Sequence, residues 1–96
     1  MESVVLINAF EVPEGRDEEF RAGWRAAADY LRQQPGFIST RLHASLDLRA
    51  DFRFVNVAVW QSPQHFQQAV GSDEFRQLGR QIPFRSHPAL YRLIEE

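Results

Sequence analysis

The sequence of 96 residues contains no cysteine and no lysine. Without cysteine the chain can form no disulfide, no thiolate metal site and no cysteine nucleophile. Its cationic residues are all arginine, and they are scattered among acidic residues from Arg16 to Arg92. Because they form no contiguous basic stripe, we expect no nucleic-acid partner.

Long hydrophobic runs are also missing. No apolar stretch approaches the roughly 20 residues that a membrane-spanning helix needs. The N-terminal residues carry no basic segment, and their apolar run ends at Asn8, which is typical of a strand and not of a signal peptide. We therefore expect a cytoplasmic protein with no membrane partner.

The residues that are present have the composition of a packed globular chain. Hydrophobic residues make up 44% of the sequence and charged residues 25%, with eight phenylalanines. The length predicts a single domain spanning residues 1–96. A domain of this size buries only about 60 to 65% of the surface of its unfolded chain, so a partner subunit would add needed support.

Hydrophobic periodicity and turn residues predict the element order β-α-β-β-α-β. Strands are expected at residues 4–12, 37–46, 52–61 and 89–94, with one helix over residues 16–34. A second helix should begin at Ser62-Pro63, break at Gly71 and continue to about Gln81. This order predicts a ferredoxin-like α+β fold, in which a four-stranded antiparallel sheet carries the helices on one face.

The third predicted strand is apolar on both faces. One face carries Phe52, Phe54, Asn56, Ala58 and Trp60, and the other carries Val55, Val57 and Val59. The predicted helices can cover only one face of the sheet. We therefore expect a homodimer in which a second copy covers the face bearing the three valines.

Asn8 and Asn56 lie in the middle of apolar strands, on the face assigned to the helices. An amide buried there costs a few kcal/mol unless it finds hydrogen-bond partners. In one interpretation, the two amides bond to each other or to the backbone, and Trp60 is part of the core. In the other, these residues line a cavity and face a ligand. Metal binding is not expected, because His43, His65 and His87 have no second ligand at metal-binding spacing.

Three segments carry a family resemblance. The stretch Phe54-Val-Asn-Val-Ala-Val-Trp60-Gln-Ser, the upstream Pro35-Gly36-Phe37 and the run Phe-x-x-Ala-x-x-Ser-x-x-Phe from Phe66 to Phe75 resemble the antibiotic biosynthesis monooxygenase family. That resemblance extends from Val4 to Ile94. It implies a dimeric α/β barrel built from ferredoxin-like subunits.

The resemblance also implies an activity. Polyketide-modifying members oxidise anthrone-type phenols to quinones with O2 and without a cofactor, and the Asn and Trp of their N-x-x-x-W segment correspond to Asn56 and Trp60. A tyrosine of that family corresponds to Phe66, which has no hydroxyl. We predict Asn56, Trp60 and His65 as catalytic residues, His65 being the nearest candidate base in the sequence. The predicted substrate-binding residues are Asn8, Trp24, Phe54 and Phe66.

Two alternatives stay open. A haem-degrading branch of the same superfamily has an Asn on its first strand, which Asn8 matches. Its Trp and axial His fall on Ala69 and Gly79 here, so the iron ligand is absent and this function ranks lower. The other alternative is a barrel that binds a small molecule or serves a stress response without turnover, and the loss of the tyrosine hydroxyl at Phe66 favours it.

Overall fold

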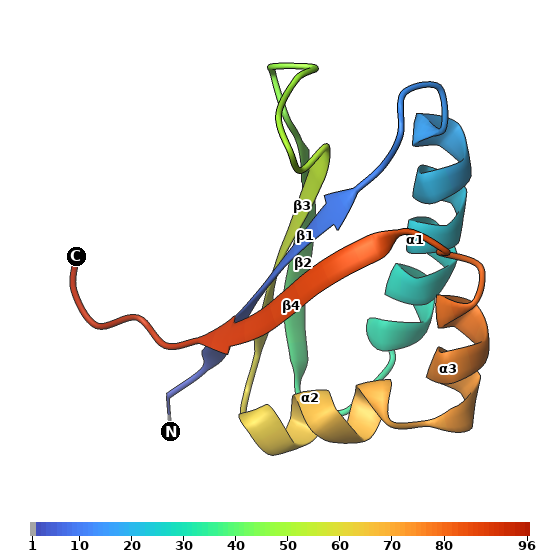
Figure 1. Ribbon diagram of the computed structural model, residues 1–96. Coiled ribbons are helices and arrows are strands. Elements are labelled where there is room, and N and C mark those ends of the chain that lie inside the picture. Colours follow the sequence, from blue (N-terminus) through green and yellow to red (C-terminus); the bar gives the residue numbers. More distant parts are fainter. Residues whose placement is uncertain (1) are drawn as a thin grey trace.

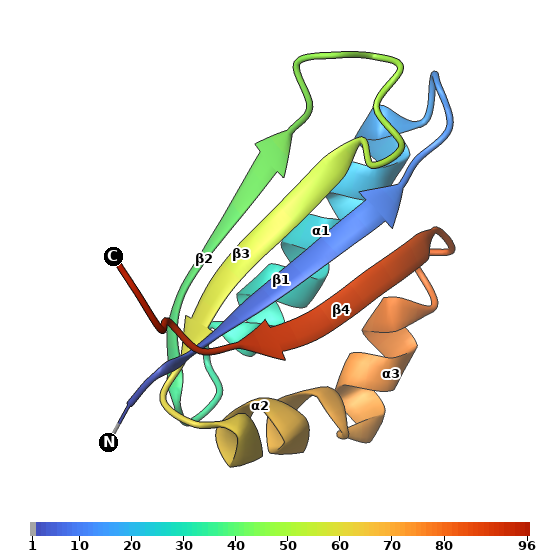
Figure 2. The ribbon, with the colours of Figure 1, turned by 60° about the vertical axis from the view of Figure 1, so that its left-hand side comes forward.

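The computed structural model describes residues 2–96 as one antiparallel sheet with all helices on a single face (Figure 1). Along the chain the elements are β1 (Val4–Glu11), α1 (Asp17–Leu31), β2 (Phe37–Ala44), β3 (Phe54–Trp60), α2 (Pro63–Val70), α3 (Asp73–Gly79) and β4 (Arg85–Tyr91). The strand order is β2-β3-β1-β4 (Figure 2). The predicted ferredoxin-like α+β fold is confirmed, and the second helix is divided at Gly71 as expected.

The last strand was placed wrongly by the sequence pattern. β4 covers Arg85–Tyr91 instead of residues 89–94, because its bounds follow its pairing with β1 and not its own apolar run. Pro88 has no N–H to donate to a ladder, but β4 is an edge strand, where proline is tolerated. Leu93 and Ile94 lie beyond the sheet and are largely exposed.

Phe52 does not join the covered face of the sheet, contrary to the prediction. β3 begins at Phe54, whose partner Phe10 is the end of the β1–β3 pairing. Phe52 lies in the preceding loop, is 39% exposed and packs its ring against His87 with centroids 5.1 Å apart. The strand alternation therefore extends over a shorter segment than the sequence suggests.

On β3 the alternation of buried and partly buried residues holds as predicted from Phe54 onward. Phe54, Asn56, Ala58 and Trp60 are buried, whereas the three intervening valines are only partly buried. In the antiparallel register, Asn8 of β1 lies directly opposite Asn56. Cross-strand partners point to the same face, so both asparagines lie on the side of the helices.

The apolar core consists of two separate clusters. One contains Leu6, Ala58, Trp60 and Ala69, and the other contains Phe10, Phe20, Phe54 and Phe84. Along β1 and β3, the Asn8–Asn56 pair lies between the two clusters. The core is therefore interrupted by polar residues at the middle of the sheet.

Phe20 attaches α1 to the sheet. Its side chain is fully buried, and its ring stacks on that of Phe54 with centroids 4.7 Å apart and an interplanar angle of 10°. The rings of Phe10 and Phe84 lie 4.7 and 5.8 Å from it. Aromatic packing of this kind contributes about 0.5 to 1.5 kcal/mol per pair beyond area burial.

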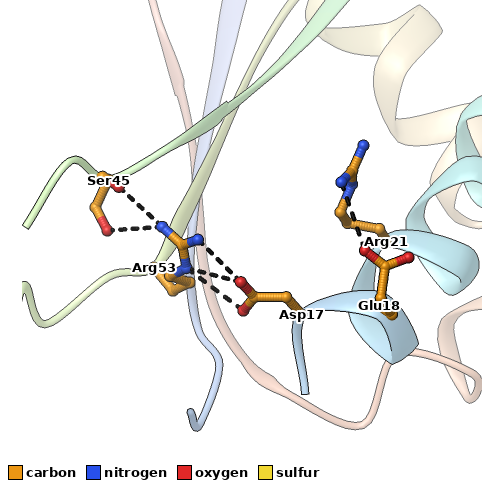
Figure 3. A network of polar contacts seen from close by, with 5 residues as sticks. All are labelled: Asp17, Glu18, Arg21, Ser45 and Arg53. Atoms are coloured by element: carbon orange, nitrogen blue, oxygen red, sulfur yellow. Dashed lines mark hydrogen bonds and ion pairs between the residues drawn. The ribbon is translucent and has the colours of Figure 1, made fainter. Parts of the chain in front are cut away.

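A polar network reinforces the same end of α1 (Figure 3). The Arg53 guanidinium donates to Asp17 Oδ2 from Nη2 over 2.9 Å and to the Ser45 carbonyl oxygen from Nη1 over 2.8 Å. Asp17 is the first residue of α1, where the helix dipole favours a carboxylate. Arg53 therefore connects the start of α1 to the loop that joins β2 and β3.

We expect Phe20→Ala to lower the free energy of unfolding by about 3 to 5 kcal/mol, because it leaves a cavity among three aromatic rings. Urea denaturation followed by circular dichroism measures the change. Leu48→Ala is the control, since Leu48 is 80% exposed and its truncation should change stability by less than about 0.5 kcal/mol. A loss below 1 kcal/mol for Phe20→Ala would contradict the central position given to this ring.

Candidate active site

A cavity of about 490 Å³ lies between the sheet and the helices. Most of its wall is apolar, and each strand and each helix contributes to it. Representative lining residues are Leu6 and Asn8 of β1, Trp24 of α1, Thr40 of β2, Asn56 of β3, Phe66 of α2, Phe75 of α3 and Pro88 of β4. An apolar cavity of this size with a few convergent polar groups is typical of a small-molecule site.

The two asparagines of the cavity do not bond each other. Asn56 Oδ1 accepts a hydrogen bond of 2.7 Å from the Thr40 hydroxyl, and Asn8 Oδ1 accepts one of 3.1 Å from the backbone N–H of His87. Neither amide nitrogen has an acceptor among residues 2–96. Both side chains therefore have an occupied oxygen and a free NH2 group.

Trp60 supplies a third donor without a partner. Its side chain is fully buried, and its Nε1 is the buried side-chain polar atom that lacks a hydrogen bond within the described chain. The indole is held edge-on by Phe37 and Phe66, with ring centroids 5.4 and 5.8 Å away. Trp60 also lines the cavity, so its indole N–H is a candidate donor to a ligand.

The structure brings together five of the predicted site residues and leaves out two. The residues that line the cavity are Asn8, Trp24, Asn56, Trp60 and Phe66. Phe54 instead belongs to the Phe20 cluster and borders a separate groove between α1 and β2. His65 is also absent from the cavity lining.

His65 is held at the start of α2. Its Nδ1 is 2.7 Å from the Ser62 hydroxyl, which also caps the helix by accepting from the His65 backbone N–H over 3.2 Å. The ring packs on Gly36, which has φ of +87° and no room for a Cβ atom. In this geometry the imidazole contacts Ser62 and Gly36, and so packs at the junction of α2 with the segment before β2.

Thr40 is a site residue that the sequence analysis missed. It lies on β2 opposite Ala58, which is two residues from Asn56 on the neighbouring strand β3. Its contact with Asn56 depends on the β2–β3 register, including the irregularity between Phe37 and Ser39. The sequence does show Thr40 on the same face of β2 as apolar residues. Its contact with Asn56 could be recognised only from the β2–β3 register.

Charged groups are absent from the cavity wall as far as residues 2–96 are concerned. The pKa of Glu19 is lowered, and that of Arg16 raised, by their mutual hydrogen bonds, but this pair is exposed at the start of α1.

Within residues 2–96 no three His, Asp or Glu side chains gather to hold a metal ion. None of the described helices has the length and apolarity to cross a membrane.

We expect the double variant Thr40→Val/Asn56→Leu to be at least as stable as the unmodified protein. Replacing both partners of a buried hydrogen bond by apolar groups of the same shape is nearly neutral, whereas Asn56→Leu alone leaves the Thr40 hydroxyl unpaired and should cost about 1 kcal/mol. Urea denaturation of both variants tests this expectation. A loss above 2 kcal/mol in the double variant would show that the pair serves the fold and not a ligand.

Comparison with known proteins identifies the family. Residues 3–81 match the family model for antibiotic biosynthesis monooxygenase. No curated protein matches the chain.

Solved structures agree with the family match. A protein from Shewanella loihica PV-4 with a provisional monooxygenase name is 41% identical, with a TM-score of 0.88 over 99% of this chain and 97% of that one. SnoaB, a cofactor-independent oxygenase from Streptomyces nogalater, is 26% identical, with a TM-score of 0.88 over 100% and 97% of the two chains. A conserved protein from Methanosarcina mazei Go1 shares the fold at 14% identity, with a TM-score of 0.80 over 96% and 93%. The chain therefore belongs to the antibiotic biosynthesis monooxygenase family.

Proposed function

We propose that this protein is a cofactor-independent monooxygenase that oxidises a small aromatic phenol or hydroquinone, similar to an anthrone or a quinol, to a quinone with O2. The observation that carries the proposal is the set of three N–H donors, on Asn8, Asn56 and Trp60, that lack acceptors within residues 2–96 and border an apolar cavity. The likeness to SnoaB, a cofactor-independent oxygenase, supports the same activity.

Neutral donors in an apolar cavity suit a substrate that reacts as its anion. Such donors stabilise developing negative charge strongly where water is excluded. The substrate anion transfers one electron to O2, and the resulting radical and superoxide combine to form a carbon–oxygen bond. The carbon-bound peroxide takes up the proton that the substrate lost and then loses its C–H proton as the O–O bond breaks, so that one oxygen stays as the quinone carbonyl and the other leaves as water.

In this proposal Asn56 and Trp60 donate to the oxyanion, Asn8 assists, and Trp24 and Phe66 orient the aromatic rings. Binding the flat substrate between fixed side chains lowers the entropic part of the barrier. His65 is given no proton-transfer role, because its Nδ1 is engaged by Ser62 and its ring is not part of the cavity wall.

The activity test is O2 uptake with anthrone, measured with an oxygen electrode and corrected for autoxidation without protein. One O2 should be consumed for each anthrone converted to anthraquinone and water. Asn56→Ala should lower the rate about 100-fold, the effect of removing one donor to an oxyanion. Trp60→Phe should also lower it, because the ring remains and only the N–H is lost.

Gln61→Ala is the matched control, because it removes an exposed amide directly beside Trp60 and should leave the rate unchanged. If the unmodified protein gives no O2 uptake above autoxidation with anthrone or simple hydroquinones, the monooxygenase proposal is wrong. Ligand binding without turnover would then support a non-catalytic barrel, the alternative favoured by the missing hydroxyl at Phe66.

We also propose that the protein acts as a cytoplasmic homodimer through the open face of the sheet. No helix covers this face (Figure 1). It carries Val55, Val57 and Val59 at its centre, while Ile7 on β1 and Tyr91 on β4 are 37% and 52% exposed. An apolar sheet face of this kind is stabilised when a second copy covers it.

Val57→Asp should convert the dimer to a monomer, because it places a charge at the centre of the proposed interface. Light scattering coupled to size exclusion measures the mass. The milder Val57→Thr keeps the side-chain shape and should weaken association without unfolding the chain. Gln68→Asp adds the same charge on an exposed position of α2 and should stay dimeric. A dimer of undiminished stability in both Val57 variants would refute this interface.

A further inference from the structure

The oxygens of the two cavity asparagines are held by different kinds of donor. Asn8 is held by the backbone N–H of His87, which can only donate, so its amide orientation follows from the β1–β4 pairing. Asn56 is held by the Thr40 hydroxyl, a side-chain group. The orientation of Asn56 therefore depends on the identity of one other residue.

An asparagine amide has nearly the same shape when it is turned by 180°. The turn exchanges the carbonyl oxygen, an acceptor, with the NH2 group, a donor, so only the hydrogen-bond partners decide which one faces a ligand. Thr40 is β-branched, which restricts its side-chain rotamers, and its hydroxyl donates to Asn56 Oδ1 in this structure. As long as Thr40 donates to Oδ1, the NH2 group of Asn56 is the one left for a ligand.

The rest of the cavity reinforces this donor character. Its other unpartnered polar side-chain groups among residues 2–96 are the Asn8 NH2, the Trp60 N–H and the Ser86 hydroxyl, which can donate or accept, and the lining includes no charged side chain. A ligand with carbonyl or phenolate oxygens meets donors on this wall. A ligand whose polar group is an N–H donor finds acceptors in the hydroxyl oxygens of Thr40 and Ser86, but none in the three unpaired N–H groups.

We propose that Thr40 is a positioning residue that fixes the Asn56 amide as a donor and so makes the cavity select ligands with hydrogen-bond acceptors over ligands with donors. The proposal deepens the proposed function, because it names the feature by which that same cavity recognises its substrate. It concerns binding and requires no turnover.

The test compares ligands of the same ring size in Thr40→Val and Thr40→Ser. The ligands are 1,4-naphthoquinone, which offers two acceptors, naphthalene, which offers none, and 1-naphthylamine, which offers N–H donors. Dissociation constants come from calorimetry under nitrogen, with quenching of tryptophan fluorescence as a second readout because Trp24 and Trp60 both line the cavity.

Thr40→Val should weaken the binding of naphthoquinone about tenfold, the value of one hydrogen bond near the upper end of its usual range. Naphthalene should bind within about twofold of the unmodified protein, and naphthylamine as tightly or more tightly, because the amide can then turn its oxygen to the ligand. Thr40→Ser retains the hydroxyl and should restore naphthoquinone binding.

Equal weakening of all three ligands by Thr40→Val would reduce Thr40 to a packing role and overturn the inference. Unchanged naphthoquinone binding, or no naphthoquinone binding by the unmodified protein, would overturn it too. The expected ligand pattern without any O2 uptake would leave the inference standing and reject only the monooxygenase activity. Turnover of anthrone together with unchanged ligand binding in Thr40→Val would reject the inference and leave the monooxygenase activity standing.

Discussion

The pairing of Asn8 with Asn56 across the two central strands is the constraint on which the cavity depends. Both residues face the helices, and apolar clusters lie on either side of them along the strands. Helices that pack on the two clusters leave a space above the polar pair. The aromatic contacts of Phe20 and the Arg53–Asp17 ion pair hold α1 at one end of that space (Figure 3).

The donors of the cavity oppose the stability of the fold. A buried polar group without a partner costs about 1 to 3 kcal/mol, and Trp60 carries such a group while fully buried. The two asparagines reduce this cost by giving their oxygens to Thr40 and to the His87 backbone. The amide and indole groups that remain unpaired are donors, which links the stability of the empty protein to its ligand preference.

Much of the fold and part of the site could be predicted from local pattern. The alternation on β3 separated Asn56 and Trp60 from the valines, and turn residues located most element boundaries. Failures occurred where pairing outweighs local composition. β4 takes its bounds from β1, and Phe52 leaves the sheet where the β1–β3 pairing ends. His65 is adjacent in sequence to the cavity residue Phe66 but is turned to the helix cap.

The sequence by itself determined the order of elements, the two faces of the sheet and the presence of asparagines on the covered face, because these follow from periodicity and turn chemistry along one segment. Tertiary structure decided which groups the amides bond. Thr40 and the His87 N–H come from β2 and β4, and their positions beside Asn56 and Asn8 depend on strand register. Hydrogen bonds between strands are set by that register, so the donor character of the cavity became visible only in the folded chain.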